Sequence, residues 1–203
     1  MKLHWSPRSP FVRKVMIFAH ETGLADRLDC VRTVVATDAT NAALLPDNPL
    51  SKIPTLVLDD GSPLYDSAVI CEYLDTLHDR PKLFPAPGPA RWAALRRQAL
   101  ADGFLDFLLL WRHERARAQP SQALLNAFAT KYQSTMALLE EEEAPPLGDT
   151  LFGIGHIAIG CSLSYLDFRF ADLGWREGHS QIAAWHASFA QRPSAKATQA
   201  AEG

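Results

Sequence analysis

A hydroxyl group stands at the start of the first helix that the sequence predicts. Ser9 precedes Pro10, and proline suits a first helical turn because its missing N–H would have no partner there. The helix, over residues 10–22, is predicted by apolar residues at i, i+3, i+4 and i+7, namely Val12, Val15, Met16 and Ala19. The free N–H groups and the dipole of a helix start favour a negative charge, to which Ser9 is placed to donate a hydrogen bond. Taken alone, Ser9 is explained more simply as a capping residue without chemistry.

Two further segments carry polar residues at turns. Residues 48–58 read NPLSKIPTLVL, and the pair Asp66-Ser67 precedes a run of apolar residues. From the residues alone, Asp66 or Ser67 caps a helix, and Lys52 is an ordinary exposed lysine. Pro54 alone predicts a trans proline that opens a strand, because cis bonds make up only about 5–6% of X–Pro bonds.

The elements that must position these residues occupy the first 78 residues. The predicted strands cover residues 2–5, 29–35, 55–58 and 63–65, and the predicted helices cover residues 10–22 and 67–77. The last two strands form a hairpin around a turn that contains Gly61. This order predicts two parallel strands joined by a crossover helix, together with an antiparallel hairpin, although it leaves several sheet orders open.

A proline-rich linker separates this part from a helical part. Residues 79–89 contain the run PKLFPAPGP, which fits neither a helix nor a central strand. The domain that follows, residues 90–203, is predicted to be all helical. Its predicted helices cover residues 90–117, 121–143, 154–171 and 181–191, and residues 194–203 are predicted to be a frayed tail.

The composition excludes several classes of function. The chain has 203 residues, 47% of them hydrophobic, which is ordinary for a globular protein. A net charge of -3 with interspersed basic residues gives no electrostatic footprint for a nucleic acid. No apolar run approaches the ~20 residues of a membrane span, and Met1-Lys2 leads into a strand without a signal peptide. We therefore expect a cytoplasmic protein without nucleic-acid or membrane partners.

The cysteines and histidines give no sign of a disulfide or a metal. Cys30, Cys71 and Cys161 are isolated and odd in number, so we expect no disulfide framework. The seven histidines include none of the spacings typical of metal ligands, so we expect no metal site.

The motifs together resemble the glutathione S-transferase family, in its bacterial form with a serine-type N-terminal motif. The resemblance rests on SPFV at residues 9–12, on NPLSKIPTL at 48–56, on DS at 66–67 and on GCSLSYLDFR at 160–169, in the family's order. It implies an α/β plus all-α fold, in which an N-terminal thioredoxin-like domain (residues 1–78) precedes an all-helical C-terminal domain. It also implies glutathione as co-substrate.

The resemblance assigns a role to each polar residue above. Ser9, the residue before PF, is the active hydroxyl, in preference to Ser6; it stays protonated and donates a hydrogen bond to the glutathione thiolate. Pro54 resembles the family's cis-proline, beside which the backbone of Ile53 pairs with the cysteinyl part of glutathione. Asp66 pairs the γ-glutamyl ammonium, Ser67 receives the neighbouring carboxylate, and Lys52 reaches a glutathione carboxylate.

The implied reaction is attack of the glutathione thiolate on a small hydrophobic electrophile. Because residues 9–12 contain no sulfur, the mixed-disulfide chemistry of cysteine-type relatives is excluded. The alternative is a non-catalytic member of the same fold that binds glutathione or a protein partner. Conjugation, isomerisation and thiol transfer all remain open as the physiological reaction.

The resemblance also implies an electrophile pocket and a homodimer. The residues expected around the electrophile are Trp5, Phe11, Phe104, Leu108 and Trp111, each of which is equally explained as a core residue. Whether Asp102 reaches a neighbouring subunit's site stays open.

One departure from the family concerns the helix at residues 154–171. Gly153-Ile154-Gly155-His156 stands where the family has a capping box of the form (S/T)-x-x-D. We therefore expect the reciprocal capping bonds to be lost and the helix start to be weaker by about 1 kcal/mol.

Overall fold

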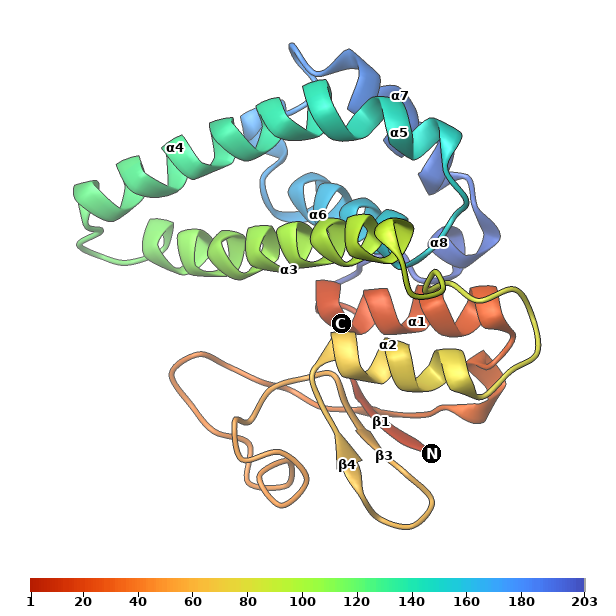
Figure 1. Cartoon of the computed structure of the whole chain (residues 1–203). Coiled ribbons are helices and arrows are strands. Elements are labelled where there is room, and N and C mark those ends of the chain that lie inside the picture. Colours follow the sequence, from red (N-terminus) through yellow and green to blue (C-terminus); the bar gives the residue numbers. More distant parts are fainter. Residues whose placement is uncertain (203) are drawn as a thin grey trace. The chain divides into compact units, whose positions relative to one another are not determined.

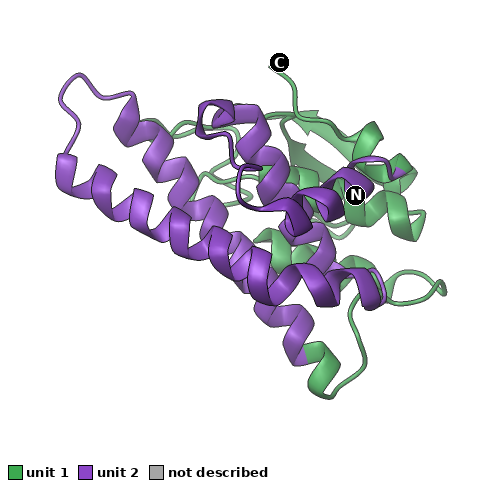
Figure 2. Cartoon of the chain, turned by 90° about the horizontal axis from the view of Figure 1, so that it is seen from above, with its two compact units in different colours: residues 1–91, 193–203 green, residues 92–192 purple. Residues whose placement is uncertain are grey.

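The structure of the protein is a computed structural model that describes residues 1–202. The chain divides into two compact units (Figures 1 and 2): Met1–Arg91 together with the C-terminal segment from Pro193, and Trp92–Arg192. The first unit contains a four-stranded sheet, and the second consists of helices. The predicted fold class is confirmed.

The sheet of the first unit has the strand order β2-β1-β3-β4. Strand β1 (Lys2–Trp5) runs parallel to β2 (Asp29–Arg32), whereas β3 (Thr55–Val57) pairs antiparallel with both β1 and β4 (Pro63–Leu64). This order resolves the alternatives that the sequence leaves open. The strand predicted over residues 29–35 ends at Arg32, and all four residues of this edge strand are exposed.

Two helices cover the sheet of the first unit. Helix α1 (Pro10–Thr22) is the crossover between the parallel strands, and it packs beside α2 (Ser67–Thr76) (Figure 1). A short 3-10 turn, Ala25–Arg27, leads from α1 to β2. Gly23 ends α1 in the left-handed conformation, with φ at 75°, which glycine adopts without a steric penalty. The apolar face predicted for α1 is buried, with Val12, Val15 and Ala19 at 0–1% exposure.

The linker is held against the first unit by one buried carboxylate. Asp75, which is 6% exposed, accepts hydrogen bonds from the backbone N–H groups of Leu83 at 3.0 Å and Phe84 at 3.2 Å. The Phe84 ring lies 5.9 Å from that of Phe18 on α1. The proline-rich segment is therefore an ordered strap.

The C-terminal segment departs from the expectation. The sequence predicts residues 194–203 as a frayed end of the helical domain, but residues 193–202 belong to the first unit, where α8 (Pro193–Ala197) contacts α1. Ala195 is 1% exposed and its carbonyl accepts a hydrogen bond from the Arg13 guanidinium at 3.2 Å. Farther along, the Ala201 N–H donates to the Pro7 carbonyl at 3.4 Å. These contacts hold a segment whose own sequence has no clear pattern.

The second unit is built from helices of very unequal length. Its elements are α3 (Pro89–Arg115), α4 (Gln122–Leu138), a π-helical turn η2 (Leu139–Glu143), α5 (Ala144–Asp149), α6 (Ile154–Arg169), a 3-10 turn η3 (Ala171–Leu173) and α7 (Ser180–Ala190). The predicted helix over residues 121–143 thus changes to π geometry at Leu139. Helix α5, which the sequence analysis does not predict, follows directly.

Helix α6 is the buried centre of the second unit. Every residue from Ile154 to Leu163 is buried, so this part of the helix is covered on all sides. Gly160 explains how a neighbouring helix comes so close: a Cβ atom built on it would lie 2.3–2.4 Å from three atoms of the Phe189 ring of α7. The glycine of the GCSLSYLDFR motif therefore provides the space for an aromatic side chain.

We expect Gly160→Ala to lower the free energy of unfolding by about 2–3 kcal/mol, because the new methyl group overlaps a ring that is itself only 3% exposed. Urea denaturation measures this cost. Phe189→Leu removes the overlapping ring atoms and serves as the second arm of a double-mutant cycle. If the cost of Gly160→Ala is the same in both backgrounds, the ring is not the cause.

The start of α6 keeps half of the capping box. The Gly153 N–H donates to Nδ1 of His156 at 3.2 Å, so the expectation that both reciprocal bonds are lost is wrong. Because Nδ1 accepts, the ring proton is on Nε2, which faces the Thr150 hydroxyl at 3.2 Å. Burial, with the nearby charges of Arg97 and Arg192 as lesser causes, lowers the pKa of His156 to about 4. His156 is thus a neutral capping residue.

This cap makes stability depend on pH. In the unfolded chain His156 takes up a proton near its ordinary pKa of 6.5, whereas the folded chain resists protonation until about 4. The contribution is fully present above pH 6.5 and is lost as the pH falls toward 4, by about 3 kcal/mol at most. His156→Asn supplies an acceptor that does not titrate, so it should flatten the profile. Urea denaturation at about pH 7 and about pH 4.5 tests this; equal losses in both proteins would contradict it.

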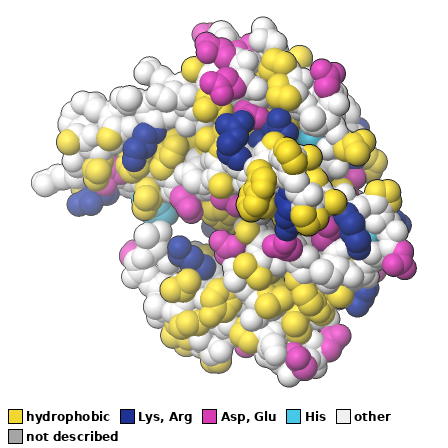
Figure 3. Space-filling model, viewed as in Figure 1, with side chains coloured by type: hydrophobic (Ala, Val, Ile, Leu, Met, Phe, Trp, Pro, Cys, Tyr) yellow, Lys and Arg dark blue, Asp and Glu magenta, His cyan; other side chains and the backbone are white. Residues whose placement is uncertain are grey.

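The first unit leaves several large apolar side chains exposed. Figure 3 shows hydrophobic side chains gathered over its strands and loops. Those with the greatest exposure are Val34 at 65%, Leu50 at 63%, Val69 at 47%, Val31 and Leu45 at 37% each, and Val35 and Tyr65 at 36% each. A cluster of this kind is typical of a contact surface.

Candidate functional site

Ser9 lies in the turn between β1 and α1. It is the N-cap of α1, and its Oγ accepts a hydrogen bond from the Val12 N–H at 3.2 Å. The hydroxyl oxygen is therefore used by the helix, while its proton remains available for donation outward. Both explanations that the sequence gives for Ser9, a capping residue and a donor to an anion, are compatible in this geometry.

Ser6 is the less accessible of the two hydroxyls. It is 7% exposed, and its Oγ accepts hydrogen bonds from the Arg32 guanidinium and, at 3.4 Å, from the Arg8 N–H. Ser9 is half-buried and stands directly at the helix start. The surroundings therefore favour Ser9 over Ser6 as a donor to a ligand.

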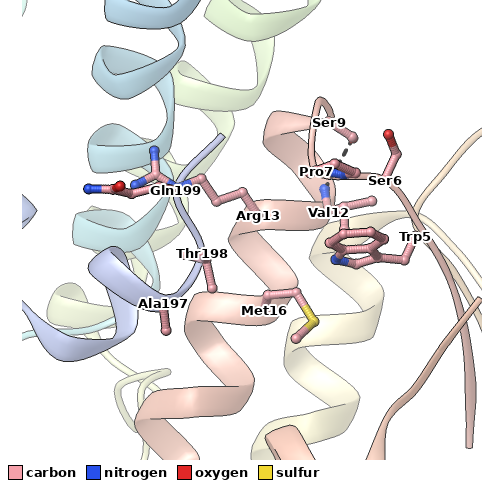
Figure 4. A pocket seen from close by; sticks show the side chains of 10 residues that line it. All are labelled: Trp5, Ser6, Pro7, Ser9, Val12, Arg13, Met16, Ala197, Thr198 and Gln199. Carbon is pink, nitrogen blue, oxygen red and sulfur yellow. Dashed lines mark hydrogen bonds between the residues drawn. The ribbon is translucent and has the colours of Figure 1, made fainter. Parts of the chain in front are cut away.

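Both serines line a hollow of about 70 Å³ in the first unit (Figure 4). Its walls come from the end of β1, from one side of α1 and from the C-terminal segment. The residues that line it are Trp5, Ser6, Pro7, Ser9, Val12, Arg13, Met16, Ala197, Thr198 and Gln199. Trp5, one of the residues expected around the electrophile, is among them. The contribution of the C-terminal segment is not predicted by the sequence analysis.

The loop before β3 is organised by Asn48, which is 1% exposed. Its side-chain Nδ2 donates to the Lys52 carbonyl at 3.2 Å and to the Thr55 hydroxyl at 3.0 Å, and its Oδ1 accepts from the Leu50 N–H at 3.0 Å. The amide therefore fixes both ends of the turn. The sequence motif alone assigns no role to Asn48, although an asparagine before a proline in a predicted turn is a signal for one.

The same loop presents backbone groups of Ile53. The peptide bond between Ile53 and Pro54 is cis, as the resemblance implies, and that between Tyr65 and Asp66 is also cis. Within the described chain, neither the N–H nor the C=O of Ile53 forms a hydrogen bond. Lys52 is exposed on the surface. These groups are available to an extended ligand.

A salt bridge and a histidine fix the residue before Asn48. The Asp47 carboxylate accepts from Lys2 at 2.7 Å and from Nε2 of His4 at 2.8 Å, and these hydrogen bonds, the one from Lys2 first, hold the pKa of Asp47 below its usual range. His4 also bonds the Thr33 hydroxyl at 2.8 Å. The loop is thereby tied to strand β1.

Asp66 and Ser67 form the start of α2. The Asp66 carboxylate accepts from the Ala68 N–H at 2.9 Å, which makes Asp66 the N-cap. Ser67 is 2% exposed, and its hydroxyl has no hydrogen-bond partner among residues 1–202. The helix start thus offers one carboxylate, one unused hydroxyl and free N–H groups to a zwitterion.

Of the other residues expected around an electrophile, Phe11 is half-buried on α1, and three lie in the core of the helical unit. Phe104 is 2% exposed, Leu108 0% and Trp111 7%. Trp111 has ring neighbours within that unit, with Phe170 at 5.4 Å and Tyr132 at 5.9 Å. These positions agree with the simpler explanation of core packing.

Among residues 1–202, no group of three or more His, Cys, Asp or Glu side chains lies close enough to hold a metal ion. None of the three cysteines forms a disulfide within the same residues; Cys30 is exposed and the other two are buried. No helix of the described chain has the length and apolarity needed to cross a membrane.

The chain is similar to known proteins over most of its length. Its residues 8–77 match the family model of the glutathione S-transferase N-terminal domain, and residues 122–188 match that of the C-terminal domain. A curated relative, the uncharacterized GST-like protein YibF of Escherichia coli K12, is 32% identical over 179 residues, which are 86% of each chain.

Two solved structures of glutathione transferase family members from Pseudomonas fluorescens Pf-5 are similar over their whole length. One, with bound glutathione, is 44% identical, covers 99% of each chain and has a TM-score of 0.95. The other, with bound S-(propanoic acid)-glutathione, is 41% identical, covers 100% of each chain and has a TM-score of 0.90.

Proposed function

Because the chain belongs to the glutathione S-transferase family, we propose that it activates the thiolate of glutathione for attack on a small hydrophobic electrophile. The observation that carries the proposal is the position of Ser9, whose oxygen caps α1 and whose proton is free to be donated at the edge of a hollow. A thiol with a pKa of about 8.5 is only slightly ionised at neutral pH. A hydroxyl donor and a helix start together would lower that pKa by about one to two units, at about 1.4 kcal/mol each.

The remaining contacts of the tripeptide are proposed for groups of the loop before β3 and of the start of α2. The backbone of Ile53 beside Pro54 is proposed to pair with the cysteinyl part. Asp66 would pair the γ-glutamyl ammonium, and Ser67 would donate to the neighbouring carboxylate. Lys52 is proposed to reach a glutathione carboxylate from the loop that Asn48 holds.

The serine-type motif sets the kind of reaction. Residues 9–12 contain no sulfur, so the protein cannot form a mixed disulfide there. A thiolate stabilised by a hydroxyl serves both conjugation and isomerisation, and we propose conjugation. Removal of reactive electrophiles is a detoxifying role, and we propose it for the cytoplasm, where a glutathione pool is present. The glutathione bound by one relative and the thioether bound by another support this proposal.

Two measurements test the function. The protein should be retained on a glutathione-affinity matrix and should conjugate glutathione to chlorodinitrobenzene or to another member of a panel of electrophiles. Retention without turnover of any electrophile would leave a glutathione-binding module instead of an enzyme. Failure of retention would remove the proposed site itself.

We further propose that the protein is a homodimer. The support is the resemblance and the exposed apolar side chains of the first unit, which include Val34 and Leu50. A stable two-fold interface should bury more than about 1,200 Å² in total. Light scattering at micromolar concentration should give twice the monomer mass of 22.4 kDa. A mass near the monomer's would remove the dimer and any role of Asp102 in a neighbouring site.

A further inference from the structure

Arg13 is a buried cation without an anionic partner. The residue is 9% exposed, and no carboxylate among residues 1–202 pairs with it. One Nη donates to the carbonyl of Ala195 at 3.2 Å, and the buried Nε has no hydrogen-bond partner. Burying an unpaired charge is costly, so buried guanidinium groups are normally paired with a carboxylate or phosphate.

The Arg13 side chain lines the hollow beside Ser9. Arg13 lies one helical turn after Ser9 on α1 and lines the same hollow. Figure 4 shows its side chain leaving α1 on the side where the C-terminal segment runs. The other side chains with hydrogen-bonding groups at that end are Thr198 and Gln199. One hollow thus combines a hydroxyl at one end with a guanidinium and an amide at the other.

Two acids that contact or belong to the C-terminal segment bind other residues. Glu202 pairs with Arg8, with Nε and Oε2 3.3 Å apart, and Glu21 accepts a hydrogen bond from the Ser194 hydroxyl. Both contacts tie the C-terminal segment to the first unit. Neither supplies a counter-charge to Arg13, so the missing anion has to come with a ligand.

We propose that the electrophile bears a carboxylate, which Arg13 binds while the glutathione sulfur lies at Ser9. This inference rests on the proposed function and narrows its substrate class from a small hydrophobic electrophile to a small organic acid with an electrophilic carbon. For a conjugated alkene, the S–C bond forms as the π electrons move to the neighbouring carbon, which takes a proton from water. The addition needs no other reactant. Gln199 is a positioning residue that completes the carboxylate site.

The test compares two glutathione thioethers that differ in one charge. S-(2-carboxyethyl)glutathione carries the carboxylate, and S-(2-carbamoylethyl)glutathione has the same shape with a neutral amide. Isothermal titration of the wild-type protein should show at least a tenfold preference for the acid. Arg13→Gln should reduce this ratio to about one, and Arg13→Lys should retain part of it.

If Arg13→Gln fails to fold, a surface variant and the affinities of the wild-type protein still test the carboxylate site. Gln199 is exposed, so Gln199→Leu is expected to fold and to reduce the preference by a few-fold. Equal affinity of the two thioethers for the wild-type protein would overturn the carboxylate site while leaving glutathione binding intact. If neither thioether nor glutathione itself binds, the proposed function fails and the inference fails with it.

Discussion

Replacing Ser9 with alanine is expected to lower turnover ten- to a hundredfold with little change in the affinity for glutathione. In the proposed site the hydroxyl would stabilise the thiolate, by about 1.4–2.7 kcal/mol, while Ile53, Asp66 and Ser67 would hold the rest of the tripeptide. Steady-state kinetics with a reactive electrophile, together with direct titration of glutathione, measures the two effects separately. Because Ser9 also caps α1, the variant should lose about 1 kcal/mol of stability and must be assayed well below its unfolding temperature.

Ser6→Ala is the matched control for this prediction. Ser6 is buried and accepts a hydrogen bond from Arg32, so its loss should affect turnover less than the loss of Ser9. If Ser6→Ala abolishes turnover and Ser9→Ala does not, the assignment of the active hydroxyl is wrong.

Ser9→Cys should enable the protein to form a mixed disulfide with glutathione. The substitution restores a sulfur at the helix start, where the dipole favours a thiolate. Mass spectrometry after treatment with oxidised glutathione should then find a mixed disulfide at residue 9, which the wild-type protein cannot form there. Cys30 is exposed in the wild-type protein, so peptide mapping must separate the two positions.

The elements of the first unit are predictable because each is specified by its own residues. Ser9, Pro10 and Gly23 mark the two ends of α1, and the apolar periodicity between them gives its buried face. Asp66 similarly marks the start of α2. The end of β2 is not predicted, because an exposed edge strand stops where its neighbour β1 stops, and not where β-type residues end.

The features that could not be predicted from the sequence depend on contacts that form only in the folded chain. In the sequence, Asn48 resembles any turn asparagine. Its role depends on the hydrogen bonds that it forms within the folded loop. The C-terminal segment has no periodic pattern, and its order comes from partners such as Arg13 and Pro7, more than 180 residues away. The site is accordingly predictable where its residues belong to local motifs, whereas the C-terminal wall of the hollow is not.

In the second unit, the start of α7 likewise depends on a contact with a residue far away in the sequence. That helix has no side-chain cap of its own, because His179 stands at the N-cap without a capping bond. Its first N–H groups are satisfied by the Glu140 carboxylate, which accepts from Gln181 and Ile182 at 2.9 Å each. Glu140 lies in the π-helical turn, so a run of four glutamates that looks like a solvated surface contains structural residues.

Glu143 is the most consequential member of this run. Its carboxylate is 0% exposed and accepts hydrogen bonds from the guanidinium groups of both Arg96 and Arg97. Arg97 also packs against the start of α6, where a Cβ atom on Gly155 would lie 2.9 Å from the Arg97 Cβ. The buried carboxylate therefore links the π-helical turn to α3 at the point where α3 contacts the central helix.

Removing this carboxylate should be the most destabilising single change of the second unit. We expect Glu143→Ala to lower the free energy of unfolding by about 3–5 kcal/mol, because it leaves the largely buried Arg97 without its counter-ion. Glu142→Ala is the matched control: Glu142 is exposed and has no partner within residues 1–202, so its loss should cost within about 0.5 kcal/mol. Urea denaturation of both variants gives the comparison, with Glu143→Gln expected to fall between them because it keeps an acceptor but loses the charge. If Glu143→Ala is no less stable than Glu142→Ala, the buried pair contributes nothing, and the π-helical turn is held by the Glu140 contacts and apolar packing alone.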